Sequence, residues 1–152
     1  MIHSIIVTDD GTEVSDRAIE MASEIAKPSN AHLTLLHVID LSEDPDSMIF
    51  GNNRELIEQA RMMNIGRVTE NKWKERAKEK IEKLSERNIK SDSECLIGHA
   101  AEKIAEFADA KKADLIVMGS SKRLKGISKI KAIGSVTRKV SELANCPVLI
   151  VH

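Results

Sequence analysis

The sequence has 152 residues, the length of a single domain, with a formal net charge of −1 and with 41% hydrophobic and 31% charged residues, which excludes a disordered or fibrous chain. Aromatic residues make up only 2%, which argues against a stacking platform for single-stranded nucleic acid, and no apolar run approaches the roughly 18 residues of a membrane span. Two cysteines and no signal-peptide pattern favour the cytoplasm, so we expect one cytoplasmic domain over residues 1–152 that binds neither nucleic acid nor membranes.

Five short apolar segments predict β-strands. They cover residues 3–8, 31–39, 93–97, 113–118 and 147–151, and the third of them is the weakest. Several of these segments are apolar without alternation, which is typical of strands that are buried on both faces of a parallel sheet.

Amphipathic segments lie between the predicted strands and predict four helices. Apolar residues recur at helical spacing over residues 14–25, 73–84, 101–108 and 136–144. We expect the second helix to begin near Arg54 unless it breaks at Gly66, after a polar, turn-rich loop over residues 40–53. The alternation of strands and helices predicts right-handed crossovers and an open α/β fold, with helices on both faces of a five-stranded parallel sheet.

The charge is unevenly distributed. Between Asp114 and Glu142 there is no acidic residue, and seven positive charges leave −8 for the rest of the chain. Such a segment is either an anion site of limited size or a solvated basic loop. The positively charged residues are Lys122, Arg123, Lys125, Lys129, Lys131, Arg138 and Lys139.

Ligands of open α/β sheets bind beyond the carboxyl ends of the strands, where the strand order reverses. The loops to inspect therefore begin at Thr8, His37 and Met118. In the third loop Gly119 has no side chain to keep a ligand from the backbone. Gly134 and Ser135 open the last helix, where unpaired N–H groups and the helix dipole favour a phosphate. The alternative is that Ser135 caps the helix and Gly119 turns the chain.

The segments IIVTDDGT, LTLLHVID, ADLIVMGSS and IGSVTRKVSELANCPVLIV resemble the universal stress protein family over nearly the whole chain. The resemblance implies an adenine-nucleotide-binding α/β fold with strand order 3-2-1-4-5. It also implies ATP, ADP or AMP as the ligand, with or without Mg²⁺.

Matched residue by residue, the resemblance places Asp10 near the adenine and ribose and assigns a backbone contact with adenine to Val38. The phosphate loop would begin at Gly119 and Ser120 and end at Gly134. The residues implied to bind nucleotide are Thr8, Asp9, Asp10, Val38, Met118, Gly119, Ser120, Lys122, Gly134, Ser135 and Val136.

The phosphate loop departs from the family pattern. Lys122 stands where the family has a second glycine, and the spacing from Gly119 to Gly134 is two residues longer. Lys122 and Arg123 therefore either neutralise phosphates or fill the space that phosphates would occupy. A triphosphate, a diphosphate, a monophosphate and an empty site all stay open.

Nothing in the sequence identifies a general base or a metal site. His32 and His37 are five apart in a predicted strand and face opposite sides, and Cys95 and Cys146 form no paired motif. We therefore expect no catalytic residue and a nucleotide-binding protein that acts in a stress response or in signalling. The alternatives are a dimeric interaction protein that does not bind nucleotide and a weak ATP hydrolase.

The last predicted strand begins at Pro147 and ends at Val151, and by the implied strand order it lies at the edge of the sheet. An apolar edge strand pairs with another chain unless it is protected. Members of the family that it resembles often dimerise through this strand. We therefore expect a homodimer formed by antiparallel pairing of residues 147–151 with their own copy.

Overall fold

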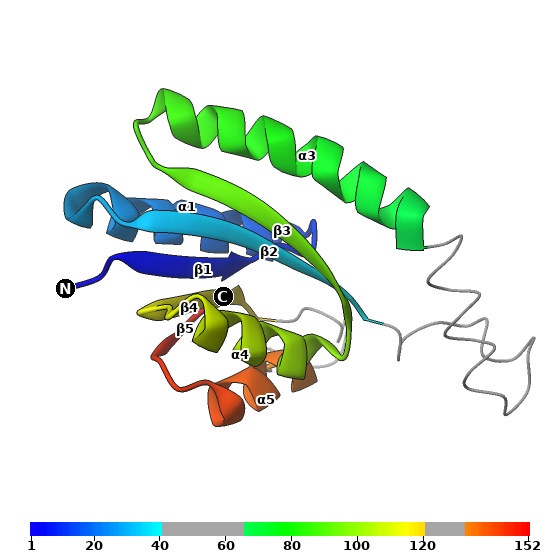
Figure 1. Ribbon diagram of the computed structural model, residues 1–152. Helices are drawn as coiled ribbons and strands as arrows, with labels where there is room; N and C mark the ends of the chain where they lie inside the picture. Colours follow the sequence, from blue (N-terminus) through cyan, green and yellow to red (C-terminus); the bar gives the residue numbers. More distant parts are fainter. Residues whose placement is uncertain (41–65, 121–132) are drawn as a thin grey trace, which may run out of the picture.

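The computed structural model describes residues 1–40, 66–120 and 133–152 (Figure 1). Its strands are β1 (Ser4–Thr8), β2 (His32–Asp40), β3 (Ser91–Gly98), β4 (Leu115–Gly119) and β5 (Val148–Val151). Its helices within those residues are α1 (Glu13–Ser29), α3 (Gly66–Glu86), α4 (Ala100–Ala110) and α5 (Ser135–Leu143).

The strands form one sheet in the order β3-β2-β1-β4-β5, and every neighbouring pair is parallel. The predicted fold class and strand order are thereby confirmed. Strand β1 lies in the centre, where Val7 is level with Leu35 of β2 and with Val117 of β4. The chain leaves β1 toward β2 on one side and enters β4 on the other, so the strand order reverses between β1 and β4.

Helices cover both faces of the sheet, α1 and α3 on one face and α4 and α5 on the other (Figure 1). Successive strand residues point to opposite faces, so Ile5 and Val7 lie in the core under α1 and α3, whereas Ile6 lies in the core under α4 and α5. All three side chains are fully buried. Burial on both faces explains why the strand segments are apolar without alternation.

The third strand is longer than predicted, eight residues instead of the expected five. Strand β3 lies at one edge of the sheet and pairs with β2 alone. Its first half alternates between half-buried residues and the exposed Asp92 and Glu94, and this polar alternation hid the strand. The bounds of the other four strands agree with the prediction to within two residues.

Helix α1 begins immediately after β1, and its first turn fixes the loop between them. Thr12 is the N-cap residue, and its side chain accepts a hydrogen bond from the Ser15 N–H at 3.2 Å. Glu13 and Asp16 lie in the first turn, where negative charge stabilises a helix. The loop of residues 9–12 is therefore held from its helix side.

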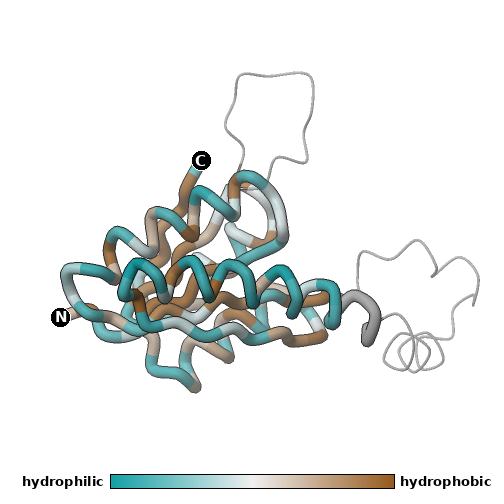
Figure 2. Tube along the Cα trace, turned by 90° about the horizontal axis from the view of Figure 1, so that it is seen from above, coloured by the Kyte–Doolittle hydropathy of each residue, from teal (hydrophilic) through white to brown (hydrophobic). Residues whose placement is uncertain are grey.

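Helix α3 is the long helix that crosses the upper face of the sheet, and most of its residues are hydrophilic (Figure 2). Trp73, Ala77 and Leu84 are buried beneath it in the core. The predicted start near Arg54 lies outside the described residues. Within residues 1–40, 66–120 and 133–152, no helix is both long enough and apolar enough to cross a membrane.

Candidate functional site

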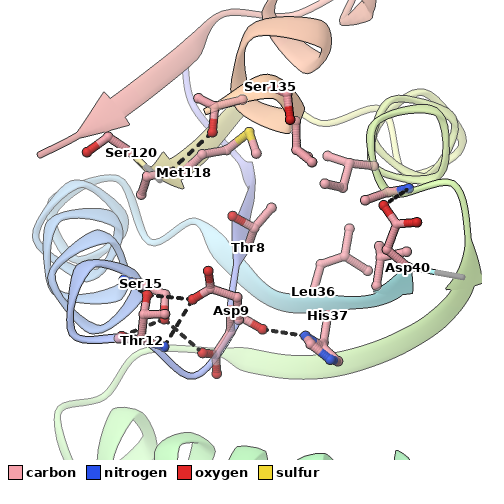
Figure 3. Close-up of a pocket in the computed structure, with 17 residues that line it drawn as sticks. Thr8, Asp9, Thr12, Ser15, Leu36, His37, Asp40, Met118, Ser120 and Ser135 are labelled. Carbon is pink, nitrogen blue, oxygen red and sulfur yellow. Dashed lines mark hydrogen bonds between the residues drawn. The ribbon is translucent and has the colours of Figure 1, made fainter. Parts of the chain in front are cut away.

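A cavity of about 180 Å³ lies at the carboxyl ends of β1, β2 and β4, where the strand order reverses (Figure 3). Nine of the residues expected to bind a ligand line it: Thr8, Asp9, Asp10, Val38, Met118, Gly119, Ser120, Ser135 and Val136. Gly134 is the residue before this lining, at the start of α5. Lys122 lies outside the described residues. The cavity is smaller than the roughly 300–1,000 Å³ of typical small-molecule sites, so the described walls enclose only part of a ligand of nucleotide size.

Asp9 lies in the wall of the cavity, but its carboxylate is engaged within the protein. The side chain is only 2% exposed. Oδ1 accepts hydrogen bonds from the Gly11 N–H at 3.0 Å and from the Ser15 hydroxyl at 3.2 Å, and Oδ2 accepts one from Lys80 Nζ at 2.8 Å. Both oxygens therefore hold the chain between β1 and α1 in place.

Asp10 is the exposed carboxylate of the pair. Its Oδ1 accepts hydrogen bonds from the Thr12 N–H at 3.0 Å and from the Thr12 hydroxyl at 2.6 Å. Partial burial raises the pKa of Asp10, but the hydrogen bonds that the carboxylate accepts from Thr12 outweigh it and hold the pKa below its ordinary value. The side chain therefore presents a fixed negative charge at the mouth of the cavity.

Gly11 makes this turn with a backbone φ of 78°, a value that glycine adopts without strain. A Cβ at this position would also lie 3.0 Å from a guanidinium nitrogen of Arg76, which reaches over the turn from α3. The turn is thus shaped by glycine and covered by α3.

His37 forms part of the cavity wall beside Asp9. Its Nδ1 lies 2.7 Å from the Asp9 carbonyl oxygen, and because a carbonyl can only accept, Nδ1 carries the proton. The ring stacks on Trp73 of α3, with 5.5 Å between ring centroids and 13° between planes. Burial lowers the pKa of His37 more than its contacts with Asp9 raise it, so the ring is neutral at pH 7.

The start of α5 forms the opposite wall. Gly134 is the N-cap residue and has no side chain that could cap the helix. Ser135 is the first helical residue and is therefore not the cap. The Thr137 hydroxyl donates a hydrogen bond to the Gly119 carbonyl at 3.3 Å, which ties the first turn of α5 to the end of β4. The first N–H groups of a helix have no partner within the helix. This wall therefore offers hydrogen-bond donors.

The packing of α1 gives a reason for glycine at position 119 that the sequence did not indicate. A Cβ at this position would lie 2.8 Å from Val14 Cγ1 and 3.1 Å from the Val14 carbonyl carbon. The space beside Gly119 is thus filled by α1, and the glycine permits the close approach of α1 to β4. The expectation that it makes room for a ligand does not account for these contacts.

Asp40 completes the wall at the end of β2. Its Oδ2 accepts a hydrogen bond from the Ala100 N–H at 3.4 Å, at the start of α4. His99 is the N-cap residue of that helix and makes no side-chain cap bond. Asp40 was not among the residues expected to bind a ligand. It directly follows the second predicted strand, and that position could have identified it.

Sequence reasoning also missed residues of the first turn of α1 and of the apolar floor. Thr12 and His37 lie in loops that the sequence singled out but were not assigned a ligand contact, and the side chains of the others face the cavity only once the helices are placed on the sheet. These residues are Thr12, Ser15, Leu36, His37, Ala100, Ile104 and Thr137.

The remaining candidates lie elsewhere. His32 is near Asp92, with 3.3 Å between Nε2 and Oδ1, and does not line the cavity. Of the seven positively charged residues of the basic segment, Arg138 and Lys139 are described, and Lys139 pairs with Glu102 of α4. In the part of the chain that the structure describes, no group of three His, Cys, Asp or Glu residues could hold a metal ion.

The sequence is similar to proteins of a known family. The sequence model of the universal stress protein family matches residues 1–152. Universal stress protein MJ0531 of Methanocaldococcus jannaschii is 36% identical over 148 residues, which cover 97% of this chain and 80% of that protein. Universal stress protein YxiE of Bacillus subtilis is 34% identical over 157 residues, with both chains covered completely.

Solved structures share the fold. Universal stress protein UspA from Lactobacillus plantarum has a TM-score of 0.74 and 21% identity, covering 99% of this chain and 98% of that one. A universal stress protein in complex with cAMP has a TM-score of 0.63 and 25% identity, covering 99% and 97%. The universal stress protein from Archaeoglobus fulgidus in complex with dAMP has a TM-score of 0.60 and 18% identity, covering 100% and 98%.

Proposed function

The chain belongs to the universal stress protein family, and we propose that it binds an adenine nucleotide in the cavity between β1, β2, β4 and α5. The observation that carries the proposal is the chemical polarity of this cavity. Asp10 and Asp40, which line the cavity, follow β1 and end β2, respectively. The hydroxyls of Ser120 and Ser135 lie on the other side, toward β4 and α5 (Figure 3). A nucleotide has the matching polarity, with donors on its base and ribose and acceptors on its phosphates.

The base and ribose belong at the acidic end. Asp10 stays ionised at neutral pH and can accept a hydrogen bond from a ribose hydroxyl or from the amino group of adenine. Val38 and Met118 supply apolar surface for the ring, and the Val38 backbone is the proposed contact with adenine. The carboxylates would repel phosphates, so the nucleotide has one preferred direction in the cavity.

The phosphates belong at the start of α5. The positive end of the helix dipole, its unpaired N–H groups and the Ser135 hydroxyl all favour an anion there. Gly134 and Val136 flank Ser135, and we include Lys122 among the phosphate-binding residues because its positive charge stands in the phosphate loop, at the position of the family's second glycine. Complexes of two family members with cAMP and dAMP support a ligand of the AMP type.

We further propose that the protein acts in the cytoplasm as a binding or signalling module of the stress response. Both oxygens of Asp9 are bonded to Gly11, Ser15 and Lys80, and the pKa of Asp10 lies below its ordinary value, so each is a weak proton acceptor for general-base chemistry. The proposed role is therefore binding, with the nucleotide as the signal.

Replacing Ser135 with alanine tests the phosphate end of the site. The variant loses one hydroxyl donor to phosphate, so we expect nucleotide binding to weaken by about 1 kcal/mol, roughly fivefold in Kd. Titration calorimetry with ATP and AMP measures the change. Ser141→Ala, on the exposed part of the same helix, is the matched control and should leave both affinities unchanged. An unchanged Kd for Ser135→Ala would remove Ser135 from the site.

We also propose a homodimer formed through β5. Strand β5 pairs with β4 alone, which leaves its other edge without a neighbour among the described residues. Its four residues are apolar and only partly buried, and no charge interrupts them. Pairing with a second copy would satisfy the open backbone groups and cover the apolar surface.

Replacing Ile150 with lysine tests this dimer. A lysine on the open edge strand is expected to yield a folded monomer, because the buried ammonium would lack a partner at the interface. Light scattering should give a mass of about twice 16.8 kDa, the mass of one chain, for the unmodified protein. The variant should have the mass of a single chain. Glu94→Lys on β3, the opposite edge, is the control and should remain a dimer. A mass of one chain for the unmodified protein would contradict the proposal.

A further inference from the structure

One face of α3 lies over the β1 end of the cavity without lining it. Trp73, Arg76 and Lys80 recur at helical spacing on this face. Each contacts a residue of the cavity wall or of the turn between β1 and α1. Trp73 stacks on His37, Arg76 covers Gly11, and Lys80 binds Asp9. The three contacts converge on the chain between β1 and α1.

Lys80 makes the strongest of these contacts. Its Nζ lies 2.8 Å from Asp9 Oδ2 and 2.9 Å from Asp16 Oδ1, and its side chain is 24% exposed. Burial lowers the pKa of Lys80, but the bonds to the two carboxylates outweigh it and raise the pKa above its ordinary value. The side chain is therefore a permanent cation beside a carboxylate that is almost completely removed from water.

Asp9 passes this restraint on to the turn. Its other carboxylate oxygen accepts the Gly11 N–H, and its carbonyl accepts the proton of His37. Its backbone N–H donates to the Leu36 carbonyl at 2.8 Å. Both carboxylate oxygens of Asp9 are thus bonded within the protein, and the position of Asp9 sets that of Asp10, the next residue.

We propose that Lys80 is a positioning residue of the nucleotide site, which neutralises buried Asp9 and thereby holds Asp10, Gly11 and Thr12 in the geometry that receives the base and ribose. This inference rests on the proposed nucleotide binding. It assigns to Asp9 the role of a support rather than of a ligand contact. A buried carboxylate that loses its cation must either take up a proton or move toward water, and either change displaces the turn.

Lys80→Met is the test, since methionine keeps most of the length and removes the charge. We expect nucleotide affinity by calorimetry to fall about tenfold or more, because the partner carboxylate is left buried and unpaired. Lys74→Met is the matched control on the same helix. It removes an exposed pair with Glu70 and should change affinity less than about twofold.

Rescue separates positioning from direct contact. In the double variant Asp9→Asn with Lys80→Met no buried charge remains, and the asparagine oxygen can still accept from Gly11, so we expect affinity within about threefold of the unmodified protein. A double variant that stays folded but does not regain affinity would overturn the proposal, because the Asp9 carboxylate would then contact the ligand itself. Equal affinities of Lys80→Met and Lys74→Met would overturn it too.

A second measurement does not require nucleotide binding. The Gly11 amide proton bonds to Asp9, so hydrogen exchange followed by NMR should show faster exchange of Gly11 in Lys80→Met and restored protection in the double variant. If Gly11 exchanges faster in Lys80→Met but the unmodified protein binds no nucleotide, the proposed function is wrong. The role of Lys80 in holding the turn would still stand. Unchanged Gly11 protection in Lys80→Met would overturn the positioning role in either case.

Discussion

Replacing Trp73 with alanine is expected to lower the free energy of unfolding by about 3–5 kcal/mol, the range found when a large buried aromatic side chain is removed. Trp73 is 1% exposed and is the largest fully buried side chain of the core under α1 and α3. It is also the only tryptophan of the chain. Urea denaturation followed by circular dichroism measures the loss, because the variant has no tryptophan fluorescence.

Phenylalanine at the same position provides the control. The indole Nε1 of Trp73 is buried and has no hydrogen-bond partner among the described residues, an arrangement that costs about 1–3 kcal/mol. Phenylalanine removes this unpaired donor and keeps a ring to stack on His37, so Trp73→Phe should be clearly more stable than Trp73→Ala. Equal losses in the two variants would contradict the packing described for α3.

The second large effect is expected from Gly119→Val. The added side chain would overlap Val14, whose Cγ1 lies 2.8 Å and whose carbonyl carbon lies 3.1 Å from the new Cβ. Helix α1 must then move away from β4, and we expect a loss of about 1–3 kcal/mol or more in the free energy of unfolding. Nucleotide affinity should fall with it, because Thr12 and Ser15 of the same helix line the cavity.

A double variant identifies the cause. Val14→Ala removes the Cγ1 contact but leaves the backbone contact, so it should restore only part of the stability of Gly119→Val. Ser120→Ala is a neighbouring change that adds no atom and should leave α1 in place. If Gly119→Val abolished binding while its unfolding curve stayed unchanged, Gly119 would act on the ligand rather than on α1.

Much of the fold could be predicted from the sequence, because both faces of the sheet are covered. Residues such as Ile5, Ile6 and Val7 had to be apolar without interruption, and that pattern identifies a buried parallel strand. Strand β3 was underestimated, since at the edge of the sheet Asp92 and Glu94 can face water. Apolar patterns alone do not determine the strand order, which was predicted from the family resemblance.

The candidate site was predictable where it follows a strand. Thr8, Val38 and Ser120 lie at strand ends, and the general rule for open α/β sheets brings such residues together. The contributions of α3 could not be predicted. Lys80 and Asp9 are 71 positions apart, and nothing local to either residue indicates their contact. The reason for Gly119 likewise depends on how closely α1 packs on β4.

The most direct test of the account is calorimetric titration of ATP, ADP and AMP into the unmodified protein, with GTP as the control for the base. We expect at least one adenine nucleotide to bind in the micromolar range, about −8 kcal/mol, and GTP to bind more weakly. Binding should also raise the melting temperature, because a ligand of the folded state stabilises it. No heat and no rise in melting temperature with any of the three adenine nucleotides at about 1 mM would contradict the proposed function.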